Sequence, residues 1–243
     1  MMRLFITSIL LCLSWPALAD CSSPLMGGRE PTLVIDTRIC EPGYTIGYSD
    51  LLRSPLWVAQ YLTPASIQEA EAYNRDCYIK AFDGVTDGAE NSDYEHSGYD
   101  RGHMAPAGDF GINQQQTCHL ANMVPQLPDL NRKLWRSIER QTRDLAEEHG
   151  GAFIISGPLY GGVPDYLSQR IPIPEAIFKI VVTEKGAWAY VATNHEPIEC
   201  RLTSIDRLEA ERGAYMVPAL SEDQKQFRWI PEPVTGCLRE EVQ

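Results

Sequence analysis

Apolar residues recur every three or four positions from about Leu130 to Glu148, and this spacing predicts an amphipathic α-helix. Its apolar stripe consists of Leu130, Leu134, Ile138 and Leu145. Asp129 precedes the run and is a residue type that caps helices, while His149 and Gly150 follow its end. A shorter helix is predicted from about Ser204 to Arg212. Thr203 and Asp206 fit a capping box there, and Gly213 fits a C-terminal stop.

Other apolar runs are rich in β-branched and aromatic residues, which is typical of strands. They predict an extended segment from Leu33 to Tyr48, a strand from Leu56 to Leu62, a short buried strand from Ala152 to Ser156 that ends at Gly157-Pro158, and a hairpin from Ile177 to Thr193 that turns at Glu184-Lys185-Gly186. The polar stretch from Thr63 to Gly98 predicts a loop with one helical turn near Ile67 to Tyr73. Strands and helices follow no repeating order, so one mixed domain is expected.

The first 19 residues differ from the rest and predict a secretory signal peptide. Arg3 supplies a positive start, an apolar run extends from Leu4 to Trp15, and Ala17-Leu18-Ala19 has the small-residue pattern of a cleavage site. The run is shorter than the roughly 20 residues that span a membrane, which disfavours an uncleaved anchor. One arginine is too few for a mitochondrial transit peptide. We therefore expect an exported single domain, residues 20–243, without stable membrane association.

Cysteine usage agrees with export. Seven cysteines occur, and without Cys12 in the signal segment six remain: Cys21, Cys40, Cys77, Cys118, Cys200 and Cys237. An even number in an exported chain favours disulfides, although six cysteines allow 15 pairings. We expect Cys200 to pair with Cys237 and Cys21 with Cys40, which leaves Cys77 for Cys118. The alternative is that one or two are free, buried thiols.

The net charge of −12 helps to decide between two classes of nucleic-acid protein, a binding module and a hydrolase. A protein that only coats nucleic acid is usually basic. An enzyme needs positive charge only near its site. The acidity therefore argues against a static nucleic-acid-binding module more than against a hydrolase.

The candidate catalytic and metal-binding residues are in the motif Asp100-Arg101-Gly102-His103 and at Asn131, 28 residues after His103. An imidazole can act as a general base near neutral pH, and an amide oxygen can bind a hard cation. Gly102 permits an unusual backbone angle or a close approach. Asp100 is interpreted as a turn residue. Together these groups suit hydrolysis of a phosphodiester.

The predicted helix carries further polar residues. Asn131, Glu139 and Arg143 lie at multiples of four positions, and each step of four turns an α-helix about 40° further, so Asn131 and Glu139 share one broad face. The arginines and lysine on this helix form a basic patch that can attract phosphate: Arg132, Lys133, Arg136 and Arg140.

Four segments resemble the DNA/RNA non-specific endonuclease family, a ββα-metal group: YDRGHMAPAGDF, LANMVPQLPDLNRKLWRSIE, ISGPLY and IPEAIFKIVV. The resemblance covers roughly residues 43–237. It implies an α+β, ββα-metal nuclease fold in which helices flank a central, mainly antiparallel sheet. It also implies Mg²⁺ as cofactor, with Mn²⁺ as a substitute, DNA and RNA as substrates and 5′-phosphate products. A homodimer is left open.

The resemblance assigns roles by position. His103 corresponds to the family's general base, Asn131 to its direct metal ligand, and Glu139 to the carboxylate that holds metal-bound water. Arg101, Arg143 and Arg75 correspond to arginines that contact phosphate. Two alternatives stay open: a catalytically inactive nuclease-like module that binds nucleic acid, and a phosphodiesterase for small nucleotides.

Overall fold

The computed structural model describes residues 21–226 and 229–240. The expected signal peptide, residues 1–19, lies outside the described residues and stays a prediction. Within the described ranges, no helix has the length and apolar character needed to cross a membrane.

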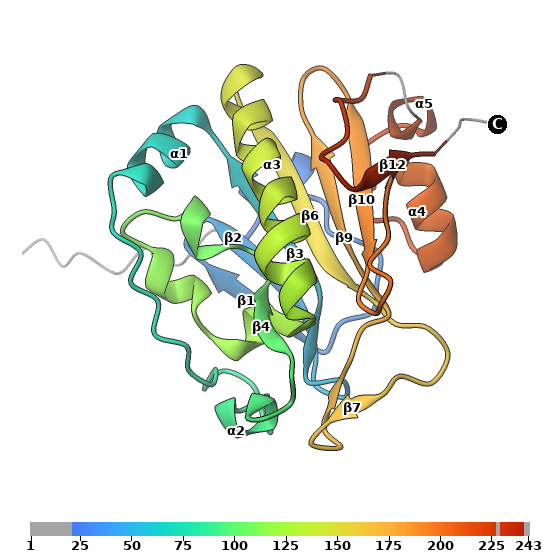
Figure 1. Ribbon diagram of the computed structural model, residues 1–243. Coiled ribbons are helices and arrows are strands. Elements are labelled where there is room, and N and C mark those ends of the chain that lie inside the picture. Colours follow the sequence, from blue (N-terminus) through green and yellow to red (C-terminus); the bar gives the residue numbers. More distant parts are fainter. Residues whose placement is uncertain (1–20, 227–228, 241–243) are drawn as a thin grey trace, which may run out of the picture.

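A sheet of eight strands runs through the molecule in the order β1-β2-β3-β6-β9-β10-β11-β12 (Figure 1). Its neighbours are antiparallel except for the parallel pair β11–β12. Its strands are β1 (Thr37–Glu41), β2 (Tyr44–Ser49), β3 (Ser54–Leu62), β6 (Ala152–Leu159), β9 (Ala176–Val182), β10 (Ala187–Thr193), β11 (Cys200–Thr203) and β12 (Cys237–Arg239). Two small sheets pair β4 (Asp100–His103) with β5 (Met123–Gln126), and β7 (Tyr166–Leu167) with β8 (Ile171–Pro172).

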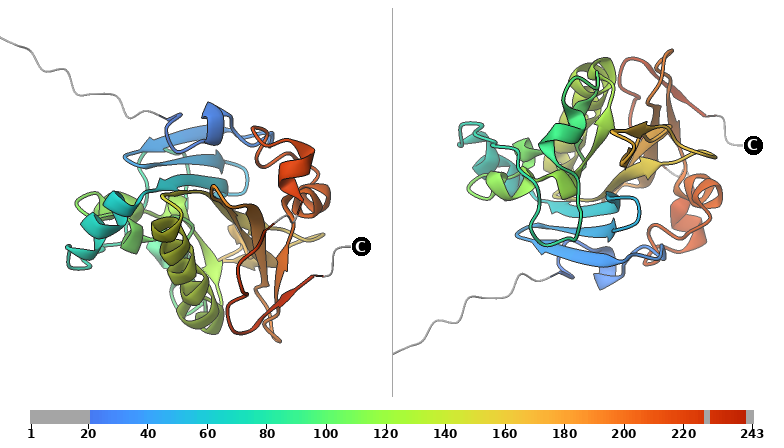
Figure 2. Two further views of the ribbon diagram at one scale, coloured as in Figure 1. Left: turned by 90° about the horizontal axis from the view of Figure 1, so that it is seen from above. Right: turned by 90° about the horizontal axis from the view of Figure 1, so that it is seen from below.

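Helices cover both faces of the large sheet (Figure 2). The α-helices are α1 (Pro64–Glu71), α2 (Asn91–Tyr94), α3 (Arg136–Glu148), α4 (Ile205–Arg212) and α5 (Glu222–Lys225). Short 3₁₀ turns are η1 (Met26–Gly28), η2 (Ala107–Asp109), η3 (Gln114–Thr117) and η4 (Leu120–Asn122), and a π-helical turn, η5 (Leu130–Trp135), leads into α3. The expected α+β class with a mainly antiparallel central sheet is confirmed.

Strand β9 shows how the two faces are filled. Ile177 and Val181 pack in the core that includes Ile138 of α3. Phe178 and Ile180 point the other way, into the core that includes Leu208 of α4. Because successive side chains of a strand alternate between faces, a continuous apolar run supplies both cores.

Several boundaries differ from the sequence-based expectation. The segment from Leu33 to Tyr48 is not one extended piece, because a turn at Pro42-Gly43 separates β1 from β2. Gly43 has φ 89°, a conformation that only glycine adopts without strain. The strand expected to end before Gly157 instead continues through Pro158 to Leu159. The hairpin formed by β9 and β10 is confirmed.

Neither predicted helix cap makes a side-chain capping bond, although Asp129 does stand at the N-cap position of η5. The Asp129 side chain makes no capping bond and instead pairs with Lys133 at 3.0 Å. Ser204, rather than Thr203, is the N-cap of α4, and no side chain caps that end. Gly213 does end α4 in the left-handed region, as predicted. The three expected disulfides are all present: Cys21–Cys40, Cys77–Cys118 and Cys200–Cys237.

Candidate active site

The ββα unit formed by β4, β5 and the η5–α3 helix supports most of the predicted site residues. Strand β4 consists of the four motif residues themselves, and His103 pairs with Met123 of β5. The chain then passes to η5, whose second residue is Asn131. The sequence motif is therefore a strand, and two distant segments come together because β4 pairs with β5 just ahead of the helix.

Gly102 is required by a close approach and not by its backbone angle. A Cβ atom added to Gly102 would lie 2.1 Å from Cδ of Gln126, which is buried on β5. Any larger residue would have to displace the buried Gln126 side chain or push the two strands apart. The glycine thus lets β4 pack closely against the Gln126 side chain at the position before His103.

Asn122 fixes the backbone that follows His103, and sequence reasoning did not single it out. Its side chain is fully buried. The amide oxygen accepts from the backbone N–H of Ala105 at 3.0 Å, while the amide nitrogen donates to the carbonyls of Ala105 and Thr117. Three hydrogen bonds therefore hold the turn after the motif.

Asp100 orients the predicted metal ligand, so its interpretation as a turn residue is wrong. It begins β4, and its Oδ2 accepts a hydrogen bond from Nδ2 of Asn131 at 2.9 Å. Arg132 donates to both carboxylate oxygens, at 2.8 and 2.6 Å. These bonds help to hold the pKa of Asp100 below its usual value, against the opposing effect of burial. With its nitrogen committed to Asp100, Asn131 can present its amide oxygen to a cation.

A cavity of about 310 Å³ brings most of the predicted site together. Its lining residues are Arg75, Arg101, His103, Pro106, Asn131, Arg132, Arg136 and Glu139. The expectation that Asn131 and Glu139 lie on the same side of the helix is therefore confirmed. Sequence reasoning had assigned Arg132 and Arg136 only to a general basic patch.

His103 is a neutral imidazole at physiological pH. Burial lowers its pKa to about 4, and the positive charge of Arg75 acts in the same direction, as does His119. Its Nε2 lies 3.7 Å from Sγ of Cys77. A neutral imidazole that lines a polar cavity can accept a proton from a molecule bound there.

The pKa of Glu139 is shifted in the opposite direction, upward. Burial raises the pKa of this carboxyl to about 7, while Lys179, the strongest opposing influence, lowers it. Lys179 itself is fully enclosed: its Nζ donates to Ser156 at 2.8 Å and lies 5.2 Å from the ring centroid of Trp135. A buried cation below the helix therefore favours the ionised form of Glu139.

Arg143 does not line the cavity. Its guanidinium donates to Oδ1 of Asp109 at 2.7 Å, and Asp109 also accepts from Gln60 of β3 at 2.7 Å. Although Glu139 lies one helical turn away, the ion-pair partner of Arg143 is the buried Asp109 on η2. Arg143 therefore joins α3 to η2 and lies outside the cavity lining.

Arg101 and Arg75 approach the cavity in different ways. Arg101 is anchored, because it donates to the carbonyl of Asn91 at 2.9 Å and stacks over the Tyr94 ring at 5.3 Å. Arg75 is exposed and lies on the irregular segment that carries Cys77. The guanidinium of Arg101 is thus held in place, while that of Arg75 lines the cavity from an irregular segment.

Comparison with known proteins agrees with this geometry. The family model of the DNA/RNA non-specific endonucleases matches residues 22–223. A zebrafish relative, the mitochondrial nuclease EXOG, is 30% identical over 210 residues, which cover 74% of this chain and 61% of the relative. Human mitochondrial endonuclease G is 28% identical over 201 residues, which cover 72% of this chain and 67% of the relative.

A solved structure shows the same fold. The crystal structure of an EndoG/EndoGI complex superposes with a TM-score of 0.70 at 26% identity, covering 79% of this chain and 89% of that chain. The chain spans about three fifths of the length of the zebrafish relative. Because the family model extends over most of the sequence and includes the whole ββα unit, this chain belongs to the DNA/RNA non-specific endonuclease family.

Proposed function

We propose that this chain is a metal-dependent endonuclease that hydrolyses phosphodiester bonds of DNA and RNA with little sequence preference. One observation carries the proposal: neutral His103 and the oriented amide of Asn131 line the same small cavity, together with four arginines. A base, a hard-cation ligand and several guanidinium groups are the parts that phosphodiester hydrolysis requires.

The donor set fits a hard divalent cation. Asn131 offers an amide oxygen whose partner nitrogen is already bound to Asp100. Glu139 offers a carboxylate in the same cavity. Mg²⁺ prefers oxygen ligands and keeps several waters, so one direct ligand with a nearby carboxylate is sufficient, and Mn²⁺ accepts the same ligands. When bound, the cation would supply charge stabilisation at the leaving oxygen of the phosphodiester.

The residues of the chain perform the remaining steps. His103 takes a proton from a water molecule, which attacks phosphorus in line with the leaving 3′-oxygen. The leaving oxygen departs with the upstream fragment, so the downstream product carries a 5′-phosphate. Arg101 and Arg75 hold the phosphate, and Arg143, bound to Asp109, favours the ionised form of Glu139 by its positive charge. Because phosphate and sugar contacts carry little sequence information, cleavage has little sequence preference.

A basic groove extends from this cavity and provides a path for the polynucleotide. It shares Arg132 and Arg136 with the cavity and adds Lys133 and Arg140, all on the η5–α3 helix. In a chain with net charge −12, positive charge gathered beside the site directs a polyanion there. A substrate longer than a dinucleotide is thereby favoured.

We further propose that the protein is exported after removal of residues 1–19. The apolar run and small-residue pattern of that segment support this, as do three disulfides, which persist in oxidising compartments. The relatives named above are mitochondrial by name. Mass spectrometry of protein recovered from the producing cell decides the point: a mature N-terminus at Asp20 is expected, and an intact Met1 would contradict export.

The test of the activity is incubation of the mature protein with plasmid DNA and with RNA, with Mg²⁺ or with EDTA. We expect cleavage of both, which EDTA prevents. His103→Ala should abolish cleavage, and the matched variant His195→Ala, at an exposed histidine, should retain it. Binding of plasmid without cleavage in Mg²⁺ would favour an inactive module. Faster turnover of a dinucleotide than of plasmid would favour a small-nucleotide phosphodiesterase.

A further inference from the structure

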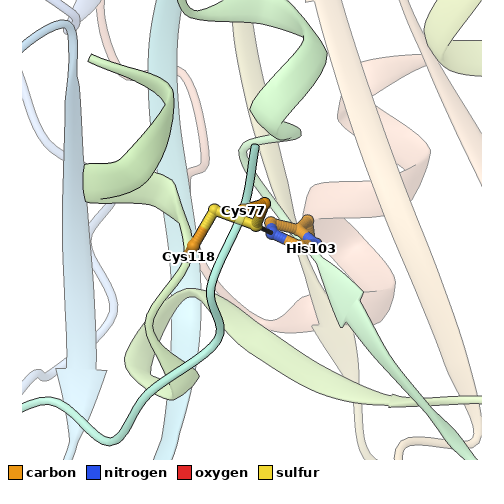
Figure 3. A group of neighbouring side chains, drawn as sticks. All are labelled: Cys77, His103 and Cys118. Atoms are coloured by element: carbon orange, nitrogen blue, oxygen red, sulfur yellow. Dashed lines mark hydrogen bonds between the residues drawn. A yellow bond between two sulfur atoms is a disulfide. The ribbon is translucent and has the colours of Figure 1, made fainter. Parts of the chain in front are cut away.

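The Cys77–Cys118 disulfide lies directly against His103 (Figure 3). Nε2 of His103 is 3.7 Å from Sγ of Cys77, and one ligand atom from each of the three residues lies within 4.8 Å of the others. Neither cysteine has a part in the proposed hydrolysis. Two sulfur atoms and an imidazole nitrogen in such proximity form a set that metals recognise, once the sulfurs are thiolates.

Backbone contacts, and not only the disulfide, hold Cys77 in place. It lies on an irregular segment, residues 74–80, which we call the strap. Gln114 accepts from the backbone N–H of Asp76 and donates to the carbonyl of Asn74, and Gln115 makes the same two kinds of bond to Tyr78. These four hydrogen bonds flank Cys77 on both sides.

Cys118 is fixed from the other side. It is fully buried at the end of η3, and its backbone carbonyl accepts from Lys80 N–H at 3.1 Å. The two cysteines are thus brought together by pairing of the strap with η3. Reduction of the disulfide would leave both sulfurs beside His103.

The spacing suits Zn²⁺ in particular. Zn–S bonds of about 2.3 Å and Zn–N bonds of about 2.0 Å, at a tetrahedral angle, separate sulfur from nitrogen by about 3.5 Å. Cys77 and His103 are already at 3.7 Å. Two thiolates would balance the charge of the ion, so its binding adds no net charge beside Arg75. Water would complete the fourth position.

We propose that reduction of Cys77–Cys118 converts this corner of the molecule into a Cys₂His site for a soft divalent metal, best matched by Zn²⁺, in which His103 is a ligand. In the reduction, a thiol reductant passes two electrons and two protons to the disulfide and leaves as its own disulfide. Zn²⁺ then displaces the two protons from the cysteines. Nε2 of His103 becomes bound to the metal.

The consequence for activity rests on the proposed function, whereas metal binding does not. A His103 bound to zinc is held in one orientation and its imidazole is less basic, so it is a poorer base for hydrolysis. The disulfide keeps His103 available. The protein would then be active when oxidised and inactive when reduced in the presence of zinc.

Cobalt spectroscopy tests the site independently of activity. The whole mature protein is reduced with a phosphine and titrated with Co²⁺, which reports cysteine ligands by thiolate-to-cobalt absorption. Reduction also frees the other four described cysteines. The Cys77→Ser/Cys118→Ser variant therefore measures how much Co²⁺ these other cysteines bind. The matched control is Cys21→Ser/Cys40→Ser, which also lacks two cysteines but keeps the proposed site.

We expect reduced wild type and Cys21→Ser/Cys40→Ser to bind one more Co²⁺ than Cys77→Ser/Cys118→Ser, with tetrahedral absorption that Zn²⁺ displaces. His103→Ala should weaken Co²⁺ binding by more than about tenfold. Loss of a residue that only hydrogen-bonds a metal ligand already weakens binding by at least about tenfold. Equal cobalt spectra in wild type and Cys77→Ser/Cys118→Ser would overturn the site. Loss of native circular dichroism on reduction would overturn it too, because the site exists only in the folded chain.

Nuclease assays in Mg²⁺ then test the consequence. Zinc at the concentration that saturates the cobalt-displacement titration should inhibit reduced wild type, and it should leave oxidised wild type and reduced Cys77→Ser/Cys118→Ser active. Equal zinc inhibition of all three would overturn the switch. An oxidised protein with no nuclease activity would refute the proposed function, while the cobalt measurement would still decide the site.

Discussion

Asp100 accepts a hydrogen bond from the side-chain nitrogen of Asn131, at 2.9 Å, across the junction between β4 and the η5 turn. This contact decides which end of the Asn131 amide faces the cavity. Removing it should leave the amide free to rotate. In proteins, loss of such a partner commonly weakens metal binding by about 10–100-fold.

Asp100→Ala is therefore expected to raise the Mg²⁺ concentration for half-maximal cleavage by about 10–100-fold, with the same maximal rate at saturating Mg²⁺. The control is Asp129→Ala, which removes an exposed carboxylate from the same end of the helix and a pair with Lys133. It should shift the Mg²⁺ requirement little. Equal shifts in both variants would mean that Asp100 acts only through net charge.

Glu139 should couple cation binding to proton release. Its pKa is raised to about 7, chiefly by burial, so near neutral pH the metal-free protein holds a proton there in part. A cation favours the carboxylate, so binding expels that proton. Affinity for Mg²⁺ or Mn²⁺ should then increase with pH up to about 7, by at most tenfold per unit, and level off above.

Calorimetry in two buffers of different ionisation enthalpy measures the released proton directly. Below pH 7 the wild type should release a fraction of a proton that falls as pH rises, and Glu139→Gln should release none. Glu147→Gln, at an exposed position on α3, should behave as the wild type. A proton count that is the same in Glu139→Gln would contradict the assignment.

Gly102→Ala should separate β4 from β5. The added methyl would lie 2.1 Å from the Gln126 side chain, and overpacking of this kind costs about 1–3 kcal/mol of unfolding free energy. The cleavage rate should fall even where the protein remains folded, because His103 is the next residue and would be displaced. Gly162→Ala is the control, since an added Cβ there meets nothing within 4 Å. Denaturant unfolding and a cleavage assay at 25 °C measure the two effects.

The basic groove should make binding sensitive to salt. In an inactive His103→Ala background, loss of one phosphate contact reduces the slope of log K against log salt by about 0.9 for duplex DNA. We expect Arg140→Ala to show this reduction and Lys185→Ala, which is exposed on the β9–β10 turn and lines neither the groove nor the cavity, to show none. Fluorescence anisotropy across a salt series provides the slopes. A slope unchanged by Arg140→Ala would remove this residue from the substrate path.

The sequence predicted features that depend on local pattern. Spacing and residue type over a short stretch of sequence predict the apolar stripe of α3, the β9–β10 hairpin and the motif around His103. Even the three disulfides could be paired by position. The resemblance located Asn131 and Glu139, and the structure places both beside His103 in one cavity.

Features that depend on contacts between distant segments could not be predicted. Asp109 is an ordinary turn residue in sequence, yet it receives Arg143 and Gln60 from two other elements. Lys179 interrupts an apolar strand, which could have marked it as a functional cation. Its place beneath Trp135 depends on how the sheet meets α3. Asp100 looked like a turn residue because its partners, Asn131 and Arg132, lie on another element.

The π-helical turn between Leu130 and Trp135 has a consequence for how this gene can change. A π turn arises when a helix accommodates one additional amino acid, so it is a length difference and not a substitution. With Lys133 deleted and ordinary winding restored, Asn131 and Glu139 would be seven positions apart, which is about 700° of rotation, or about 20° short of two full turns. They would still share one face of the helix. The spacing between these two residues is therefore no fixed signature of the site, because a chain one residue shorter at this turn keeps its geometry.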